Sequence, residues 1–263
     1  MTDRPPRVFD PRDDPASDDA DHWDPLTVAL VRIRRDPRLI VPFLLAGVFL
    51  TLVDYLRLED PIPTVERAVP WSNGVSIDLA YAGFPTGVPQ TTTHLESLVG
   101  LHPEYLAWGL ALYLFPLLAV AAAGAVTIAR AMDQPVRLEA VGAVFGFVLA
   151  ADLLHRLLGS IELLQGMGLV GVPLLVGYLL VTVRLFAVPG LLVAGRSFVE
   201  AIRESARRTR GRGWTIVGVI FVVGLSSWFL ASVAAGTFVT TALVAPLHAV
   251  AIVSLLEWDT ADG

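Results

Sequence analysis

The chain contains six apolar runs of about 20 residues, separated by more polar segments. The hydrocarbon core of a bilayer requires a helix of about 20 apolar residues. We therefore predict an all-α integral membrane bundle of six transmembrane helices, with interfacial amphipathic helices and a small ordered extracytoplasmic loop. The membrane domain covers residues 39–258, and the predicted spans are about 39–56, 105–129, 139–158, 172–193, 214–234 and 238–258.

Small residues and one proline modify these predicted spans. Gly142-x-x-x-Gly146 in the third span and the alanine-rich run 121–125 in the second are typical of faces that a neighbouring helix approaches closely. In the fourth span, Pro189-Gly190 predicts a late break, because proline lacks the N–H that a helix uses.

Two arginine-rich segments have the period of amphipathic helices. The first is residues 23–38, in which Pro37 ends the helical pattern. The second is residues 197–210. The apolar face of the first consists of Leu26, Ala29, Leu30 and Ile33. Because basic amphipathic helices lie along anionic membrane surfaces, we expect both segments on one membrane face.

The second segment carries the signals of a helix start and a helix end. Ser197 and Glu200 have the spacing of a capping box. Glu204 precedes Arg208 by four residues, the order that favours an ion pair on a helix. Gly211 is placed to end the helix. Its predicted apolar stripe consists of Phe198, Ala201, Ile202, Ala206 and Thr209.

The arginines are distributed unevenly between the connections. Of the 19 arginines, 15 lie in segments on one predicted side, two lie within spans, and two, Arg57 and Arg67, lie on the other side. Since positive charge accumulates in cytoplasmic loops, both termini are predicted to be cytoplasmic, in a plasma-membrane protein. Residues 1–22 are expected to be a disordered acidic cytoplasmic tail, and residues 259–263 a second cytoplasmic tail.

The loop at residues 57–104 is predicted to lie outside, because it carries two arginines and six acidic residues. Asn73-Gly74 favours a tight hairpin turn before an alternating strand-like segment at residues 75–81. Thr93 and Glu96 repeat the capping-box spacing and predict a short helix. Whether this loop binds a ligand or covers the bundle is left open by the pattern.

Composition restricts the function classes further. The chain is 54% hydrophobic with a mean hydropathy of +0.64, above the average of soluble domains. It has no cysteine, which excludes disulfides, thiolate metal sites and cysteine nucleophiles. All 19 basic residues are arginine, the net charge is −6, and the nine acidic residues among the first 38 are all Asp. This composition resembles that of proteins from halophilic archaea.

A pattern near the fourth and fifth spans resembles poorly characterised prokaryotic membrane families. Its elements are residues 184–190 with Pro189, the Glu-Ala-x-x-x-Ser motif from Glu200 to Ser205, and the run Arg-Gly-Arg-Gly-Trp that ends at Trp214. Similar arrangements occur in YciC-like proteins, in the membrane domain attached to some glycerophosphodiester phosphodiesterases, and in haloarchaeal relatives. The resemblance covers about 30 residues. It implies a membrane architecture and assigns no activity, because these families lack an assigned reaction. The chemistry of the phosphodiesterase is not expected here, because its catalytic barrel is absent from this sequence.

Ionisable groups within spans are candidates for function, because each costs several kcal/mol unless it is paired or hydrated. The candidate intramembrane polar cluster is Asp54, Asp152, His155, Arg184 and His248. Our hypothesis is that Arg184 is neutralised by Asp152 or Asp54. Such a pair could be architectural or part of a substrate or proton path, and Arg184 could alternatively extend to the interface.

The arginines of the two amphipathic segments are candidate lipid-headgroup contacts. They are Arg32, Arg34, Arg35, Arg203, Arg207, Arg208 and Arg210. The alternative is a solvated basic connector whose charge sets only the orientation of the spans.

An enzymatic interpretation has little support in the sequence. Gly224-Leu225-Ser226-Ser227 and His248 resemble the serine and histidine elements of rhomboid-type intramembrane proteases, without the flanking pattern of those enzymes. The Gly-x-Gly-x-x-Gly run at residues 166–171 follows no strand that would build a nucleotide site. We assign no catalytic, cofactor-binding or metal-binding residue, and expect no cofactor.

The sequence therefore favours a multi-pass membrane protein without enzymatic activity, either a scaffold or an assembly partner. The alternative is a small-solute or lipid transporter that uses Asp54, Asp152 and Arg184, and a distant third is an intramembrane hydrolase. The expected partners are a bilayer with anionic headgroups and a membrane-protein partner or a second copy of the chain. No nucleic-acid partner is expected.

Overall fold

The computed structural model describes residues 25–60, 62, 64–66, 82–93, 95–158, 171–233 and 235–261. The predicted tail at residues 1–22, the hairpin turn at Asn73-Gly74, most of the glycine-rich run at residues 166–171 and the end of the C-terminal tail lie outside this part of the chain.

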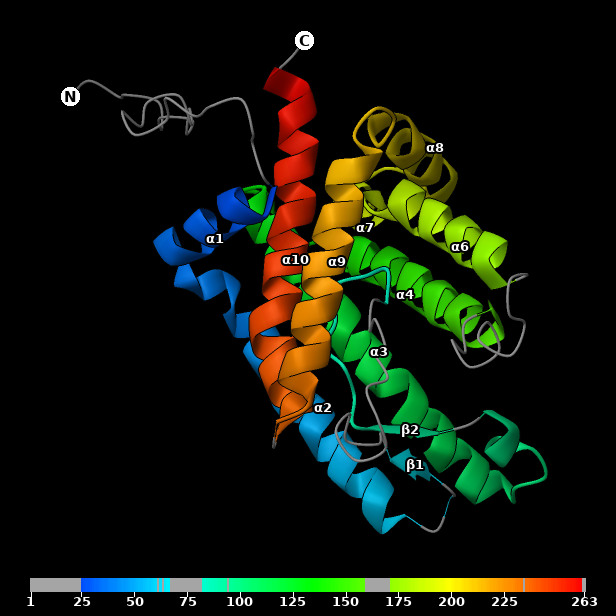
Figure 1. Ribbon diagram of the computed structural model, residues 1–263. Coiled ribbons are helices and arrows are strands. Elements are labelled where there is room, and N and C mark those ends of the chain that lie inside the picture. The colour runs from blue at the N-terminus through cyan, green and yellow to red at the C-terminus, as the bar shows by residue number, and fades with distance from the viewer. Residues whose placement is uncertain are drawn as a thin grey trace.

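The predicted all-α bundle is confirmed. Six helical segments of the described chain are long and apolar enough to cross a membrane. They are α2 (Val41–Glu59) with the preceding 3-10 turn (Pro37–Leu39), α3 (Pro103–Ala131), α4 (Leu138–Leu158), α6 (Gly171–Leu185) continued by α7 (Val188–Val193), α9 (Gly213–Ala231) and α10 (Gly236–Ala261). Figure 1 shows α9 and α10 side by side, with α2 and α3 below them and α4 and α6 directed away from the bundle axis.

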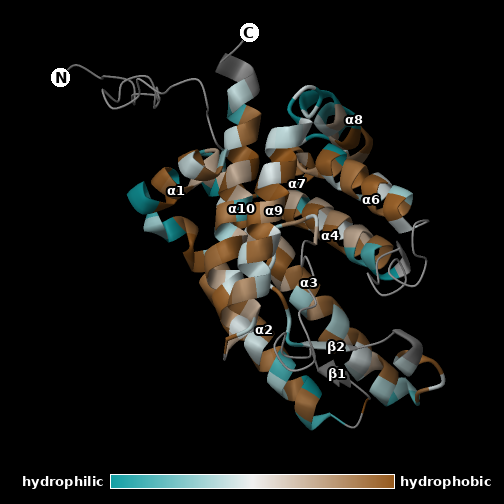
Figure 2. Cartoon of the chain, viewed as in Figure 1, coloured by the Kyte–Doolittle hydropathy of each residue, from teal (hydrophilic) through white to brown (hydrophobic). Residues whose placement is uncertain are grey.

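Helix α10 is the centre of the bundle. In its apolar window 83% of the residues are buried, whereas the corresponding share is 17% for α4. Contacts with α1, α2, α3 and α9 surround α10. Apolar residues cover the outer faces of the other helices as well as the interior (Figure 2), as expected for a surface that faces lipid.

Of the two small-residue faces predicted to pack against a neighbouring helix, the alanine-rich run 121–125 is mostly buried, whereas the Gly142-x-x-x-Gly146 face of α4 lies open. A Cβ atom added at Gly142 or Gly146 would meet no other atom of the described chain within 4 Å. Close helix contact is made elsewhere, at Gly190, where a Cβ atom would lie 2.6 Å from the Leu256 side chain and 2.9 Å from that of Ile252. The approach of α7 to α10 therefore depends on Gly190.

The fourth span breaks earlier than predicted. Helix α6 ends at Leu185, and α7 begins at Val188 with Pro189 in its first turn. A proline in the first turn is tolerated, but it cannot donate a hydrogen bond to the residue four positions earlier, which here is Leu185. The chain therefore leaves the helix at Phe186 and Ala187 rather than at Pro189-Gly190.

Helices α1 (Pro25–Arg35) and α8 (Phe198–Arg208) lie at one end of the bundle, beside the C-terminal part of α10 (Figure 1). We call this the arginine-rich end, and the end with the two short strands the opposite end. In α1, Ala29 and Ile33 are buried as predicted, whereas Leu30 is exposed.

The predicted start of α8 is confirmed. Ser197 is the N-cap residue, and its capping box with Glu200 is formed. The Ser197 N–H donates to Glu200 Oε2 at 3.1 Å. The predicted stripe is confirmed in part, because Ala201 and Thr209 are buried, whereas Phe198 is exposed. Glu204 and Ser205 are also buried, although the stripe did not include them.

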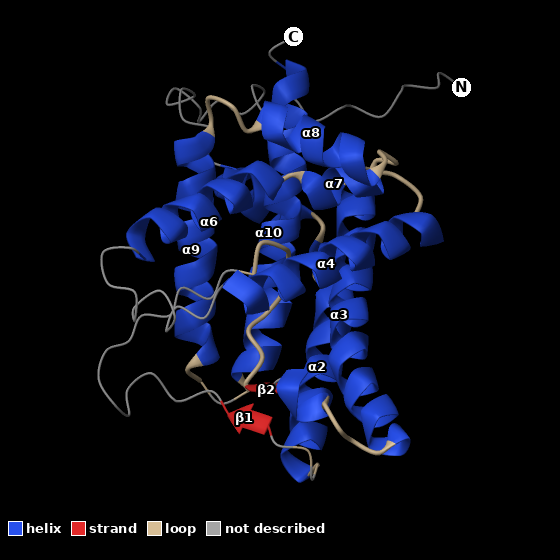
Figure 3. Ribbon diagram, turned by 90° about the vertical axis from the view of Figure 1, so that its right-hand side faces the viewer, coloured by secondary structure: helices blue, strands red, loops and turns tan. Residues whose placement is uncertain are grey.

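The described part of the outer loop contains two short strands, a segment without helices and a 3-10 helix. Strands β1 (Thr64–Glu66) and β2 (Thr91–Thr93) form an antiparallel pair that the sequence pattern did not predict. Residues 82–93 enter the bundle as an extended segment (Figure 3). We call residues 82–93 the inserted segment. The predicted short helix after it is confirmed as a 3-10 helix, Leu95–Leu98.

Candidate functional site

The most extensive polar site holds the inserted segment in the bundle. Asp54 of α2 is 6% exposed and lies beside Arg57, whose Nη1 is 3.9 Å from Asp54 Oδ1. The carboxylate accepts hydrogen bonds from the Gln90 and Thr91 N–H groups, both at 3.2 Å, and from the hydroxyls of Thr91 and Thr237. Two oxygens with four donors and a nearby guanidinium form a well-satisfied buried charge. We call these five residues the Asp54 site.

Arg57 extends the same site to α3. Its Nη1 donates to the Thr91 carbonyl at 2.9 Å and its Nη2 to the Leu112 carbonyl at 2.7 Å. Arg57 had been predicted as a residue of the outer loop. It belongs to the last turn of α2 and is 7% exposed, because its three-residue spacing from Asp54 places both side chains on one helix face.

Further contacts fix the inserted segment against α10. The Val88 N–H donates to Thr240 Oγ1 at 3.0 Å. A Cβ atom at Gly87 would lie 2.1 Å from Thr241 Oγ1 and 2.5 Å from the Thr241 backbone nitrogen, so only glycine fits there. Thr241 lies five residues from the start of α10, which places this contact about 8 Å below the helix end. Irregular backbone at such a depth requires protein partners for its polar groups, and the threonines of α10 supply them.

A second polar group connects α3, α4 and α6. Asp152 Oδ2 accepts hydrogen bonds from Tyr113 Oη at 2.8 Å and from Arg156 Nε at 2.7 Å. The Arg156 guanidinium lies 5.1 Å from the centre of the Tyr113 ring. One turn along α4, His155 Nδ1 lies 3.1 Å from Tyr178 Oη of α6.

The hypothesis that Arg184 is neutralised by Asp152 or Asp54 is wrong. Arg184 Nη1 donates to the Ala206 carbonyl at 2.8 Å, near the end of α8, while the two aspartates are occupied by Arg156 and Arg57. The reason is the helix break after Leu185. The hypothesis assumed one unbroken helix, in which Arg184 would lie inside the bundle at the depth of the aspartates. The break instead brings the end of α6, with Arg184, against α8.

Ser205 of α8 joins the two ends of this break. Its hydroxyl donates to the Arg184 carbonyl at 2.6 Å and accepts from the Ala187 N–H, at 3.2 Å. Both backbone groups lost their helical partners at the break, and Ser205, with no exposed surface, replaces them. This residue ends the Glu-Ala-x-x-x-Ser motif.

His248 lies apart from the other members of the predicted polar cluster. It is 1% exposed, and its ring stacks on Phe186 with 5.3 Å between the centroids. Helices α9 and α10 run antiparallel, and counting equal numbers of residues from the connection between them places His248 opposite about Val219. Val219 is eight residues, or about 12 Å, from Ser227 along α9. The serine and histidine elements of the hydrolase hypothesis therefore lie at different depths. The five predicted cluster residues form separate sites rather than one cluster.

At the arginine-rich end, three arginines contact consecutive residues of α10. Arg208 Nη1 donates to the Leu256 carbonyl at 3.2 Å, Arg32 Nη1 lies 2.7 Å from Glu257 Oε2, and the Arg212 guanidinium lies 4.7 Å from the Trp258 ring centre. Arg32 and Arg208, both predicted as headgroup contacts, thus bond within the protein. Arg34, Arg35, Arg203, Arg207 and Arg210 are exposed.

Glu204 balances part of this charge. It lies 2.5 Å from Arg208 and 3.3 Å from Arg196, so the predicted Glu204–Arg208 pair is confirmed with a second arginine added. At the start of the same helix, hydrogen bonds from the Ser197 hydroxyl and the Ser197 N–H lower the pKa of Glu200 below its ordinary value.

Comparisons with protein-family models, with curated proteins and with solved structures find no match. The resemblance to YciC-like and phosphodiesterase-associated membrane domains therefore stays a prediction. Within the described residues, no group of three or more His, Cys, Asp or Glu side chains is placed to hold a metal ion.

Sequence reasoning missed several residues that build these sites. Arg57 and Arg156 lie three and four residues from Asp54 and Asp152, so helix spacing alone could have paired them. The partners of Asp54 on α10 and on the inserted segment carry no comparable local signal.

Proposed function

We propose that this chain is a multi-pass plasma-membrane protein without enzymatic activity that acts as a scaffold or assembly partner. The observation that supports this proposal best is the use made of the intramembrane ionisable groups. Asp54 and Arg57 hold the inserted segment. Asp152 and Arg156 connect α4 to Tyr113 of α3, and Arg184 donates a hydrogen bond to the Ala206 carbonyl of α8. Each group stabilises the arrangement of the chain itself, as expected of a rigid assembly platform.

The proposed orientation places both termini and the arginine-rich end in the cytoplasm. The contacts of Arg32, Arg208 and Arg212 with residues 256–258 bring α1, α8 and the end of α10 to one side. Positive charge near short connections is retained on the cytoplasmic side during insertion. Single cysteines at Arg203 and at Val99, in a chain without native cysteine, test this with an impermeant maleimide on intact cells. Labelling at position 203 and protection at position 99 would overturn the orientation.

The partner is expected on α4, which has the lowest buried share of the six spans. A photo-crosslinking side chain at Gly142, which has no neighbour within 4 Å, would form a protein adduct of defined mass. The matched control is Val250 of α10, which is fully buried and would yield adducts only within the chain. Adducts to lipid alone from position 142 would argue against an assembly role.

A transporter is the second candidate, and the inserted segment favours it. Non-helical backbone at membrane depth occurs in transporters, where it lines a substrate path. Uptake into proteoliposomes by the native chain, abolished by Asp152→Asn, would support this candidate over the scaffold. Asp152 is suited to the test because it is half-buried and bonded to Tyr113 and Arg156.

A further inference from the structure

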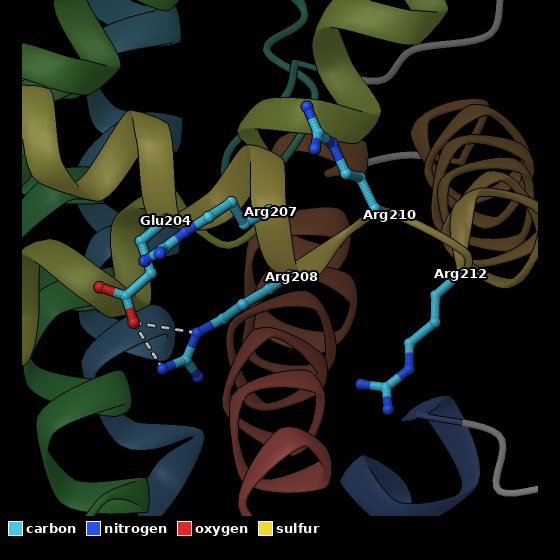
Figure 4. Close-up of a pocket in the computed structure, with 5 residues that line it drawn as sticks. All are labelled: Glu204, Arg207, Arg208, Arg210 and Arg212. Atoms are coloured by element: carbon cyan, nitrogen blue, oxygen red, sulfur yellow. Dashed lines mark hydrogen bonds and ion pairs between the residues drawn. The ribbon is translucent and has the colours of Figure 1, made fainter.

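A cavity opens at the arginine-rich end, between the last turn of α8 and the connection to α9. Its volume is about 370 Å³. Figure 4 shows its lining residues, Glu204, Arg207, Arg208, Arg210 and Arg212. We call this cavity the arginine pocket. It is large enough for a phosphorylated headgroup rather than a single small ion, since ligand sites in proteins start at about 300 Å³.

The charge of the arginine pocket is positive after its internal pairs are counted. Among the described residues, Glu204 is the only acidic one in the lining, and it is already shared by Arg208 and by Arg196 from outside the pocket. Arg207 and Arg210 are exposed. In Figure 4, Arg210 and Arg212 extend from the connection in different directions and do not converge on one point. This arrangement suits a ligand with several anionic oxygens, because each guanidinium can bind a different one.

The start of α9 adds to this potential. Its N-cap residue is Arg212, no side chain caps the first turn, and that turn contains no acidic residue. The N–H groups at a helix N-terminus favour an anion nearby. Gly211, with a φ of +83°, makes the turn between Arg210 and Arg212, both of which line the pocket.

The position of the pocket selects a lipid over a soluble ligand. Trp214 follows Arg212 by two residues and is 89% exposed, as is typical of a residue at the membrane interface. Below it on the same face of α9, Phe221, Val222 and Leu225 are exposed. A Cβ atom at Gly218 would meet nothing within 4 Å, so no other part of the described chain covers this face between Trp214 and Phe221. An acyl chain can lie along it while its phosphate occupies the pocket.

We propose that the arginine pocket binds the phosphate-bearing headgroup of an anionic phospholipid, with one acyl chain along the exposed face of α9. The proposal rests on the proposed anionic-leaflet environment of this end. The lipid would connect α8 to α9, and Arg207 and Arg210 would supply the contacts that are not already used within the chain.

The test compares two double variants of the full chain in nanodiscs. Arg207→Gln/Arg210→Gln removes two charges from the pocket, and Arg34→Gln/Arg203→Gln removes two exposed charges of the same end outside it. Native mass spectrometry after transfer from discs of phosphatidylglycerol mixed with phosphatidylcholine measures retained lipid. The pocket variant is expected to lose about 100-fold or more in phosphatidylglycerol affinity, because each lost guanidinium–phosphate hydrogen bond contributes about 1.5–3 kcal/mol. The control variant should lose only the general attraction of exposed charges to an anionic surface, which salt screens.

Equal losses in the two variants would overturn the proposal, because they would show attraction to the whole surface. No loss in the pocket variant would overturn it as well. Competition by free glycerol phosphate as strong as that by the lipid would refute the assignment to a lipid. Since both faces of a nanodisc carry the same lipid, these results do not depend on the orientation or on the scaffold role, which the labelling and crosslinking experiments test separately.

Discussion

Replacing Asp54 by Asn perturbs the site on which the inserted segment depends. The amide keeps the shape of the carboxylate, but its NH2 group must face one of two donor pairs, Thr91 N–H and Oγ or Gln90 N–H and Thr237 Oγ. The hydroxyls can rotate, whereas the backbone N–H groups cannot. Arg57 then also loses its buried counter-charge. Removing one partner of a buried ion pair costs about 3–5 kcal/mol, and we expect a destabilisation of that size.

The measurement is reversible unfolding in mixed micelles with increasing dodecyl sulfate, on Asp54→Asn, Arg57→Met and the double variant. The double variant should cost less than the sum of the single variants by about 0.5–3 kcal/mol, because the unpaired charge is absent from it. Additive losses, or a loss below about 1 kcal/mol for Asp54→Asn, would refute the reasoning.

A labelling experiment follows the inserted segment directly. Val88 is 6% exposed, so a cysteine at this position should react slowly with a maleimide in the native protein and fast in the Asp54→Asn background. A cysteine at Val99, which is 82% exposed, is the control and should react equally in both backgrounds. Unchanged protection at position 88 would show that Asp54 does not hold the segment.

Three further predictions concern helix contacts. Gly190→Val should cost about 1–3 kcal/mol in the same unfolding assay by overpacking α7 against α10, whereas Gly146→Val, in open space, should show no overpacking cost. Ser205→Ala should cost about 1–3 kcal/mol, because the Arg184 carbonyl and the Ala187 N–H lose their partner; no change in stability would contradict the bridging role. The pKa of Glu200 is lowered in the folded chain. The first turn of α8 should therefore be fully stabilised above the ordinary pKa of Glu and lose this contribution as the pH falls through the lowered value. Hydrogen exchange of that turn should show this acid response in the native chain and lack it in Glu200→Gln.

The sequence by itself determined the number and type of the spans. Helix length, apolar runs and arginine placement act locally along the chain, so they predict six apolar helices and the amphipathic segment that begins at Ser197. Pairs three or four residues apart, such as Asp152 with Arg156, are local in the same sense and were available to sequence reasoning.

Only the tertiary structure decided which span is central and which polar groups meet. The α10 window is as apolar as those of the fourth and fifth spans, which are far less buried, so composition does not identify α10 as the central helix. Asp54 meets Thr237 across 183 residues, and Arg184 meets Ala206 only because the chain leaves the helix before Pro189. Such contacts depend on how helices pack and where one of them breaks, and periodicity within a single helix contains no information about either.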